Sequence, residues 1–311
     1  MAEIAEPESA PALLTSFKGR DLSNRELGLA GNDREERSHL RRRWSARGIG
    51  NSFPTSGGTK FAANRKQFIT RLKDLAMHAL FAELIGTLLL VLLGNGVVAN
   101  VVLAKTKGEN GGLVTIALGW AMAVFIAVSC TASYSGAHLN PAVTLALAVA
   151  GKFPWEHVFG YMFAQMTGGM AGAILVWLIY RKHFESTPDP KRKLSAFCTG
   201  PAIRGLTGNL ISETAATFVL VYGVLHMASP KVGLGAIDAL PVSLLVLGIA
   251  VSLGGTTGFA LSPARDLSPR IMHALLPIPG KGDSDWGYAW IPVVGPIMGG
   301  LLAALMYSYS L

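Results

Sequence analysis

Two short stretches of the chain each combine a helix-capping residue, a proline and an alanine. They are the motif residues Asn140, Pro141, Ala142, Ser262, Pro263 and Ala264. Asn and Ser favour the N-cap because the side-chain oxygen accepts a free backbone amide, and Pro suits the first helical position because it has no amide to satisfy. Either motif alone predicts only a helix start. Two such starts after long apolar segments predict paired half-helices in a membrane, whose N-termini repel cations and favour neutral solutes with oxygen lone pairs.

The composition is that of a membrane protein. Half of the 311 residues are hydrophobic and 15% are charged, whereas a soluble protein carries about a quarter charged residues. The mean hydropathy is +0.41. The 36 glycines favour close helix packing in lipid. Only Cys130 and Cys198 occur, so the sequence predicts no disulfide framework.

Long apolar segments predict an all-α membrane protein with six transmembrane helices and two half-helices. A span needs about 20 residues, so we expect the short fifth segment to extend into its flanking sequence. The half-helices, Pro141–Val149 and Pro263–Leu275, are too short to cross and follow the second and fifth spans. The six expected spans are Met77–Val102, Val114–Ala132, Val158–Tyr180, Asn209–Met227, Leu240–Leu253 and Trp290–Tyr309.

The two halves of this region resemble each other, at about residues 75–182 and 205–311. Glu83 and Glu213 occupy equivalent places, and a Gly-Gly pair recurs in the third and sixth spans. Three spans per half predict an inverted repeat, in which the half-helices enter from opposite faces and meet N-terminus to N-terminus. A carboxylate within a span needs partners, so each Glu is either a proton or ion site or a brace for loop backbone. Their equivalence favours the brace.

Residues 1–74 differ from the membrane domain expected at 75–311. Lys and Arg outnumber Asp and Glu there, and few sustained apolar patterns occur, which predicts a disordered basic arm. The arm has three interpretations: a solvated tail without a specific role, a segment attracted to anionic lipid, or a phosphorylation site at Ser45, which follows Arg41–Arg43.

The sequence contains no residue pattern that indicates an enzyme. No nucleophile with its base, no acid–base pair and no metal-ligand spacing occurs, and His138 has no second ligand nearby. We therefore expect no cofactor, no metal and no nucleic-acid partner. Two other function classes stay open: an ion-coupled secondary transporter, which also uses repeats and broken helices, and a membrane-anchored signalling protein that acts through the basic arm.

Residues from about 77 to 309 resemble the major intrinsic protein (aquaporin) family, and within it the glycerol-conducting branch. The resemblance rests on Ser135–Thr144, with the sequence SGAHLNPAVT, and on Pro263–Asp266 followed by Ser268–Arg270. The chain departs from the family at Ser262, where the family normally has the Asn of a second Asn-Pro-Ala motif.

The resemblance also implies a selectivity filter of Trp120, Ala250, Phe259 and Arg265, and Asp266 is similar to the glycerol branch. In that arrangement the two aromatic rings form an apolar corner for the carbon edge of a polyol. The Arg265 guanidinium donates to hydroxyl oxygens and opposes cations. The backbone carbonyls expected to line the pore belong to Gly136, Ala137, His138, Gly258 and Ala260.

The function that the resemblance implies is a passive channel for glycerol, water and similar small neutral solutes. Urea, hydrogen peroxide or a neutral metalloid acid suit such a pore as well. The family's members are right-handed helical bundles that assemble as homotetramers in the lipid bilayer. We expect the same assembly here, in the plasma membrane with both termini cytoplasmic.

Overall fold

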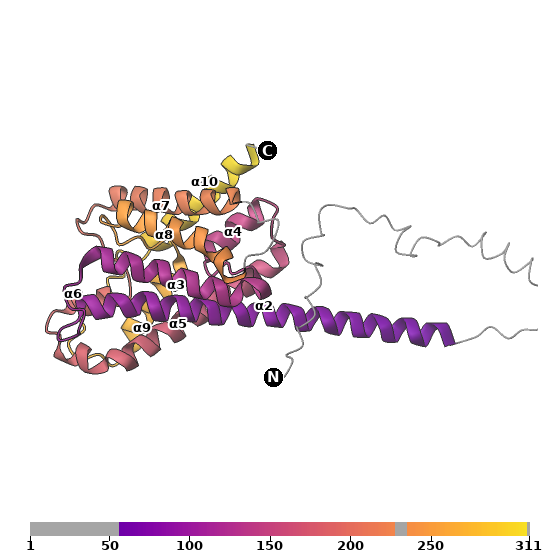
Figure 1. The fold of residues 1–311 in the computed structure, drawn as a ribbon, viewed down its shortest axis with the longest axis horizontal. Helices are drawn as coiled ribbons and strands as arrows, with labels where there is room; N and C mark the ends of the chain where they lie inside the picture. Colours follow the sequence, from indigo (N-terminus) through magenta and orange to yellow (C-terminus); the bar gives the residue numbers. More distant parts are fainter. Residues whose placement is uncertain (1–55, 228–234, 310–311) are drawn as a thin grey trace, which may run out of the picture. The chain divides into compact units, whose positions relative to one another are not determined.

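The computed structural model describes residues 56–227 and 235–309, with side chains from residue 76 onward. Ser45 and the rest of the predicted arm up to residue 55 lie outside the described residues. The described residues contain helices and no strand, as expected for an all-α protein. The compact unit that holds the helices of the bundle spans Lys66–Leu311 and is shown in Figure 1.

Five helices are long and apolar enough to cross a membrane, and a sixth, shorter apolar segment spans Ile237–Leu253. The long helices are α2 (Ser56–Val102), α3 (Gly112–Ser135), α5 (Trp155–Ser186), α7 (Leu206–His226) and α10 (Ile291–Tyr309). Each contains or nearly matches one expected span. The chain is therefore an integral membrane protein.

The fifth span is helix α8 (Leu240–Leu253), with the bounds predicted from the sequence. A 3-10 turn, η1 (Gly235–Ala239), precedes it and lengthens the apolar segment on its N-terminal side. The expected extension is thus present at this end. At the other end α8 stops at Leu253, before Gly254 and Gly255.

Helix α2 begins at Ser56, well before the predicted first span at Met77. The segment from Ser56 to residue 74, expected to belong to the disordered arm, is helical in the structure. Beyond Gly58 it contains no Gly or Pro, and its Ala, Lys, Arg, Gln and Leu residues have high helix propensity. Polar helix-forming residues can therefore continue the helix beyond the apolar span.

The half-helices α4 (Pro141–Val149) and α9 (Pro263–Leu275) have the predicted bounds. Both begin at the Pro that follows the capping residue, since these signals act within one turn of the chain. A further short helix, α6 (Pro190–Ser195), was not predicted. Its start carries the same two signals as the half-helices, a capping residue and a proline. Asp189 accepts a hydrogen bond from the amide of Lys191, and Pro190 is the first helical residue.

The paired glycines explain how closely the helices pack. A Cβ built on Gly168 of α5 would lie 2.2 Å from the carbonyl oxygen of Leu84 in α2, and one on Gly299 of α10 would lie 2.2 Å from that of Thr214 in α7. Only hydrogen fits at these crossings. The two halves of the chain thus build equivalent helix pairs.

The next glycines along, Gly169 and Gly300, allow each half-helix to pack closely against a long helix of the other half of the chain. A Cβ on Gly169 of α5 would lie 2.9 Å from the Ala264 carbonyl oxygen in α9, and one on Gly300 of α10 would lie 3.0 Å from that of Ala142 in α4. The half-helix of the second half therefore packs against α5, and that of the first half against α10.

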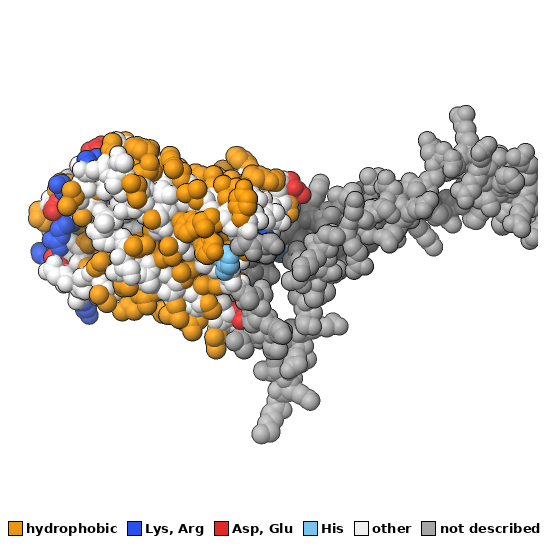
Figure 2. Space-filling view, turned by 90° about the horizontal axis from the view of Figure 1, so that it is seen from above, with side chains coloured by type: hydrophobic (Ala, Val, Ile, Leu, Met, Phe, Trp, Pro, Cys, Tyr) orange, Lys and Arg blue, Asp and Glu red, His pale blue; other side chains and the backbone are white. Residues whose placement is uncertain are grey.

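The surface of the bundle fits a bilayer. In Figure 2, hydrophobic side chains cover much of the described surface, and charged side chains gather at the end that holds α6. Large apolar side chains such as Phe159 and Ile179 are mostly exposed, at 80% and 65%. Lipid tails solvate such a surface, whereas water does not.

Candidate functional site

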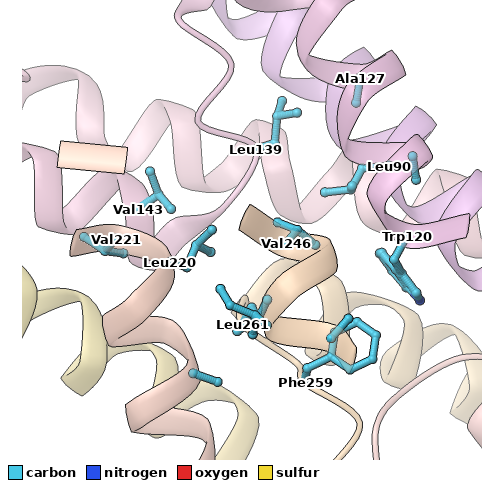
Figure 3. Close-up of a cluster of buried hydrophobic side chains, with 14 of the residues drawn as sticks. Leu90, Trp120, Ala127, Leu139, Val143, Leu220, Val221, Val246, Phe259 and Leu261 are labelled. Atoms are coloured by element: carbon cyan, nitrogen blue, oxygen red, sulfur yellow. The ribbon is translucent and has the colours of Figure 1, made fainter. Parts of the chain in front are cut away.

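A cavity of about 230 Å³ lies among the helices, with both half-helix loops in its wall. Apolar side chains from α2, α3, α4, α7 and α8 make up about half of its lining, and the two loops supply most of the rest. Figure 3 shows part of this lining, with Leu139, Leu261, Trp120 and Phe259. Of the predicted site residues, those that line the cavity are Trp120, Gly136, Ala137, His138, Asn140, Phe259, Ala260, Ser262 and Arg265.

The two capping residues hold the N-termini of the half-helices at this cavity. The Ala142 amide donates to Asn140 Oδ1 at 2.9 Å, and the Arg265 amide donates to Ser262 Oγ at 3.3 Å. Asn140 Nδ2 also donates to the carbonyl oxygen of Leu261 at 2.7 Å. This last bond joins the two loops, so the half-helices meet at their N-terminal ends.

The loops before the half-helices share an unusual backbone. Ala137 and Leu139 have φ angles of 50° and 51°, and Phe259 and Leu261 have 43° and 58°. Non-glycine residues rarely adopt this left-handed region, and each costs of order 1–3 kcal/mol. Both loops therefore need strong contacts elsewhere to keep their shape.

Glu83 supplies such contacts to the first loop. Its Oε1 accepts from Ser135 Oγ at 2.6 Å and from the His138 amide at 2.9 Å. Its Oε2 accepts from the Leu139 amide and from Gln165 Nε2, both at 2.7 Å. The carboxylate is fully buried, and these four donors provide the partners that burial requires.

Glu213 makes the equivalent contacts to the second loop. Its Oε1 accepts from the Ala260 amide at 3.1 Å, and its Oε2 accepts from the Leu261 amide at 3.2 Å. Thr257 adds a side-chain hydrogen bond. Neither Glu lines the cavity, so both carboxylates face the loop backbone rather than the space a solute would occupy.

Three of the four predicted filter residues meet at the cavity wall: Trp120, Phe259 and Arg265. The Arg265 guanidinium carbon lies 4.2 Å from the centroid of the Trp120 ring. Arg265 Nε and Nη1 and Trp120 Nε1 are buried and have no hydrogen-bond partner among the described residues. Both side chains thus carry N–H donors that no acceptor in the described part of the protein satisfies.

Other predicted residues do not reach the cavity. Ala250 is fully buried in the apolar cluster that also holds Phe259, and neither it nor Gly258 lines the cavity. The short Ala250 side chain fits this burial. The prolines and alanines of the two motifs are buried in the packing of the half-helices.

A buried network behind Arg265 was not predicted from the sequence. Asp266 Oδ2 accepts from the Thr199 amide at 2.7 Å and from its hydroxyl at 2.6 Å. Arg270 pairs with Asp266 at 2.9 Å and donates to the Thr199 carbonyl oxygen at 2.8 Å. The sequence contains one sign of this network, the i, i+4 spacing of Asp266 and Arg270, which allows an ion pair on a helix. The network ties the segment after α6 to the half-helix that carries Arg265.

His138 packs against the first half-helix and the segment that follows it. Its Nδ1 lies 3.1 Å from Thr144 Oγ1, and its ring lies 4.6 Å from that of Phe153, centroid to centroid. No group of three or more His, Cys, Asp or Glu that could hold a metal occurs within the part of the chain that the structure describes.

Comparison with known proteins agrees with this geometry. A glycerol uptake facilitator protein of Streptococcus pneumoniae is 53% identical over 75% of this chain and 99% of its own length. A probable glycerol uptake facilitator protein of Thermotoga maritima is 52% identical, again over 75% of this chain and 99% of its own length. The X-ray structure of the aquaglyceroporin from Plasmodium falciparum matches with a TM-score of 0.67 and 31% identity, over 75% of this chain and 95% of that chain.

The family model described as major intrinsic protein matches residues 71–307. This range covers both half-helices, α2 from residue 71 onward and α10 up to residue 307. The chain belongs to the major intrinsic protein family, whose members are channels and not enzymes.

Proposed function

We propose that the protein is a passive transmembrane channel for glycerol, other small neutral solutes and water. The observation that carries the proposal is the cavity wall, where Arg265, Trp120 and Phe259 set unpartnered N–H donors beside aromatic faces. A polyol matches both features of this wall. Its oxygens accept hydrogen bonds from the N–H donors, and its carbon edge packs on the aromatic rings. The relatives named for glycerol uptake support the same solute.

The two half-helices add an electrostatic barrier. Their N-termini meet at the Asn140–Leu261 bond, and each N-terminus carries roughly half a positive charge. Together with the Arg265 guanidinium this arrangement disfavours cations while neutral solutes pass. Glu83 and Glu213 act as braces that hold the loop carbonyls toward the pore, and the two halves form an inverted repeat.

The alternatives from the sequence receive less support. An ion-coupled transporter needs an ion site at mid-membrane, and both buried Glu carboxylates are occupied by loop amides. A signalling role through the basic arm would not explain the cavity between the two half-helix loops. We further propose a homotetramer in the plasma membrane with cytoplasmic termini, and a phosphorylation site at Ser45 of the arm.

Swelling of proteoliposomes tests the proposed function. Vesicles with the full chain should swell in iso-osmotic glycerol much faster than empty vesicles, and urea should enter as a second neutral solute. Ionophores that collapse the proton and sodium gradients should leave the glycerol rate unchanged. A rate that equals that of empty vesicles, or one that needs an ion gradient, would contradict a passive channel.

A further inference from the structure

Both aromatic rings at the cavity wall rest on glycines. Trp120 of α3 and Phe259 of the second loop line the cavity (Figure 3), and each is 3% exposed. A Cβ built on Gly94 of α2 would overlap the Trp120 ring. One built on Gly254, at the end of α8, would overlap the Phe259 ring. Neither glycine lines the cavity, so both lie behind the rings, on the side away from it.

Gly94 makes room for the Trp120 ring in particular. The three atoms nearest to its Cβ position are Cε3, Cζ3 and Cη2 of Trp120, which are neighbours in the six-membered ring and lie almost equally far away. A carbon at the ring edge would be clearly closest to one of them, so the added carbon would lie over the ring face. Gly94 is buried and follows the cavity-lining Leu90 by about one helical turn. The missing side chain thus lets the indole ring cover α2.

Gly254 gives the Phe259 ring the same kind of space. Gly254 is the C-cap of α8, and its amide donates to the Ala250 carbonyl oxygen at 3.2 Å. Phe259 follows five residues later with a φ angle of 43°, and its Cε1 would lie 3.0 Å from a Cβ on Gly254. That Cβ would also meet the Ala250 carbonyl oxygen. A substitution at Gly94 therefore isolates the contact with an aromatic ring more cleanly.

We propose that Gly94 and Gly254 are positioning residues that determine specificity, because they let the two aromatic rings lie back from the pore and so set its width for a polyol. The inference rests on the proposed channel function and adds two residues to it. The width then depends on small residues behind the rings rather than on Ala250, which is absent from the cavity lining.

A methyl group on Gly94 forces the Trp120 ring toward the cavity. Carbon atoms attract each other best at about 3.5–4.0 Å, so the ring must move by roughly 1 Å to escape the overlap. On its other sides the ring belongs to a close-packed apolar cluster with Leu90 and Val98 of α2, whereas the cavity has room. A narrower pore hinders a polyol more than water, because the polyol must fit a carbon chain together with its hydroxyl groups.

The test measures glycerol and water permeability of proteoliposomes that hold the full chain or its Gly94→Ala variant. The ratio of glycerol to water permeability should fall at least about tenfold, as for one misplaced carbon atom in a close-fitting site. Gly96→Ala is the matched control, since Gly96 lies in the same helix and a Cβ there meets nothing within 4 Å. It should keep the ratio. An unchanged ratio in Gly94→Ala, or an equal fall in both variants, would overturn the proposal.

The Trp120→Leu background shows whether the ring carries the effect. Leu has no ring for the new methyl group to displace, so Gly94→Ala should leave the permeability ratio of Trp120→Leu unchanged. A double-mutant cycle of this kind isolates the coupling between the two residues. A fall of the same size in both backgrounds would show that the methyl group acts through another contact, which also contradicts the proposal.

A second control separates pore width from overpacking of α2 in general. A Cβ on Gly172 of α5 would lie 2.7 Å from the Leu88 carbonyl oxygen in α2, with no atom of Trp120 among its three nearest neighbours. Gly172→Ala should therefore lower the unfolding temperature but keep the permeability ratio. If the ratio fell as far as in Gly94→Ala, strain in α2 and not the position of the ring would decide, and the proposal would be wrong.

The remaining outcomes are also decisive. If the unsubstituted chain conducts glycerol while Gly94→Ala keeps its ratio, the positioning role fails and the channel function stands. If the unsubstituted chain carries no glycerol, the channel function fails and the positioning role fails with it. If Gly94→Ala does not fold, Gly94→Ala/Trp120→Leu replaces it. This double variant should fold and share the ratio of Trp120→Leu, and its failure to fold would overturn the proposal.

Discussion

The guanidinium carbon of Arg265 lies 4.2 Å from the centroid of the Trp120 ring, so the positive charge rests on the aromatic face at the cavity wall. Cation–π contacts of this kind stabilise a charge with few water contacts. Trp120 is 3% exposed and Arg265 is 6% exposed. The contact holds a permanent charge at the cavity wall.

Arg265→Ala should admit cations because it removes this charge. At an effective dielectric constant of about 20, a unit charge about 4 Å away opposes a cation by several kcal/mol, so the cation leak should rise at least about tenfold. Conductance of planar bilayers that hold the protein measures it. Arg181→Ala is the matched control, since Arg181 is absent from the cavity lining. Equal conductance in both variants would contradict the role of Arg265.

Glu83→Gln should destabilise the protein more than Glu213→Gln. Glu83 accepts four hydrogen bonds of 2.6–2.9 Å, whereas the hydrogen bonds that Glu213 accepts from the loop amides are 3.1 and 3.2 Å long. A Gln amide group would face buried N–H donors, and each donor left unsatisfied costs about 1–3 kcal/mol. Thermal unfolding in detergent gives the order of the two variants. The reverse order would contradict the brace interpretation.

Gly168→Ala and Gly299→Ala should each lower the stability by at least about 1–3 kcal/mol, because overpacking forces backbones apart. Their Cβ atoms would lie 2.2 Å from carbonyl oxygens of the neighbouring helix. Gly248→Ala is the control, since a Cβ there meets nothing within 4 Å. Unfolding temperatures of the three variants in one detergent check the result. If Gly248→Ala lowered the unfolding temperature as much as the other two variants, the loss of stability would not come from close packing.

Outside the membrane, the pair of Glu109 and Arg192 should respond to acid. Arg192 Nη2 lies 2.7 Å from Glu109 Oε1, and this hydrogen bond lowers the pKa of Glu109 below 4.5. A lowered pKa in the folded state stabilises the protein above the ordinary pKa, and the gain disappears as the pH falls through the lowered value. The exposed pair contributes little. Proteolysis of the loop at residues 103–111 should therefore speed up in acid, and Glu109→Gln should remove that dependence.

The sequence predicted the parts of the fold that local signals determine. Both half-helices begin at their prolines because cap and Pro act within a single turn. The start of α2 at Ser56 was missed because hydropathy marks the apolar span and not the polar turns that continue it.

Contacts between distant segments could not be predicted. The bond from Asn140 to Leu261 and the pairing of Thr199 with Asp266 depend on how the two halves meet. The absence of Ala250 from the cavity lining likewise depends on how α8 is rotated in the bundle.

The uptake of labelled glycerol by proteoliposomes, measured over a wide range of glycerol concentrations without any ion gradient, tests the channel function most directly. A passive channel predicts an initial rate that rises in proportion to concentration and far exceeds that of empty vesicles. A rate that saturates at low concentration, or that appears only when an ion gradient is imposed, would contradict it.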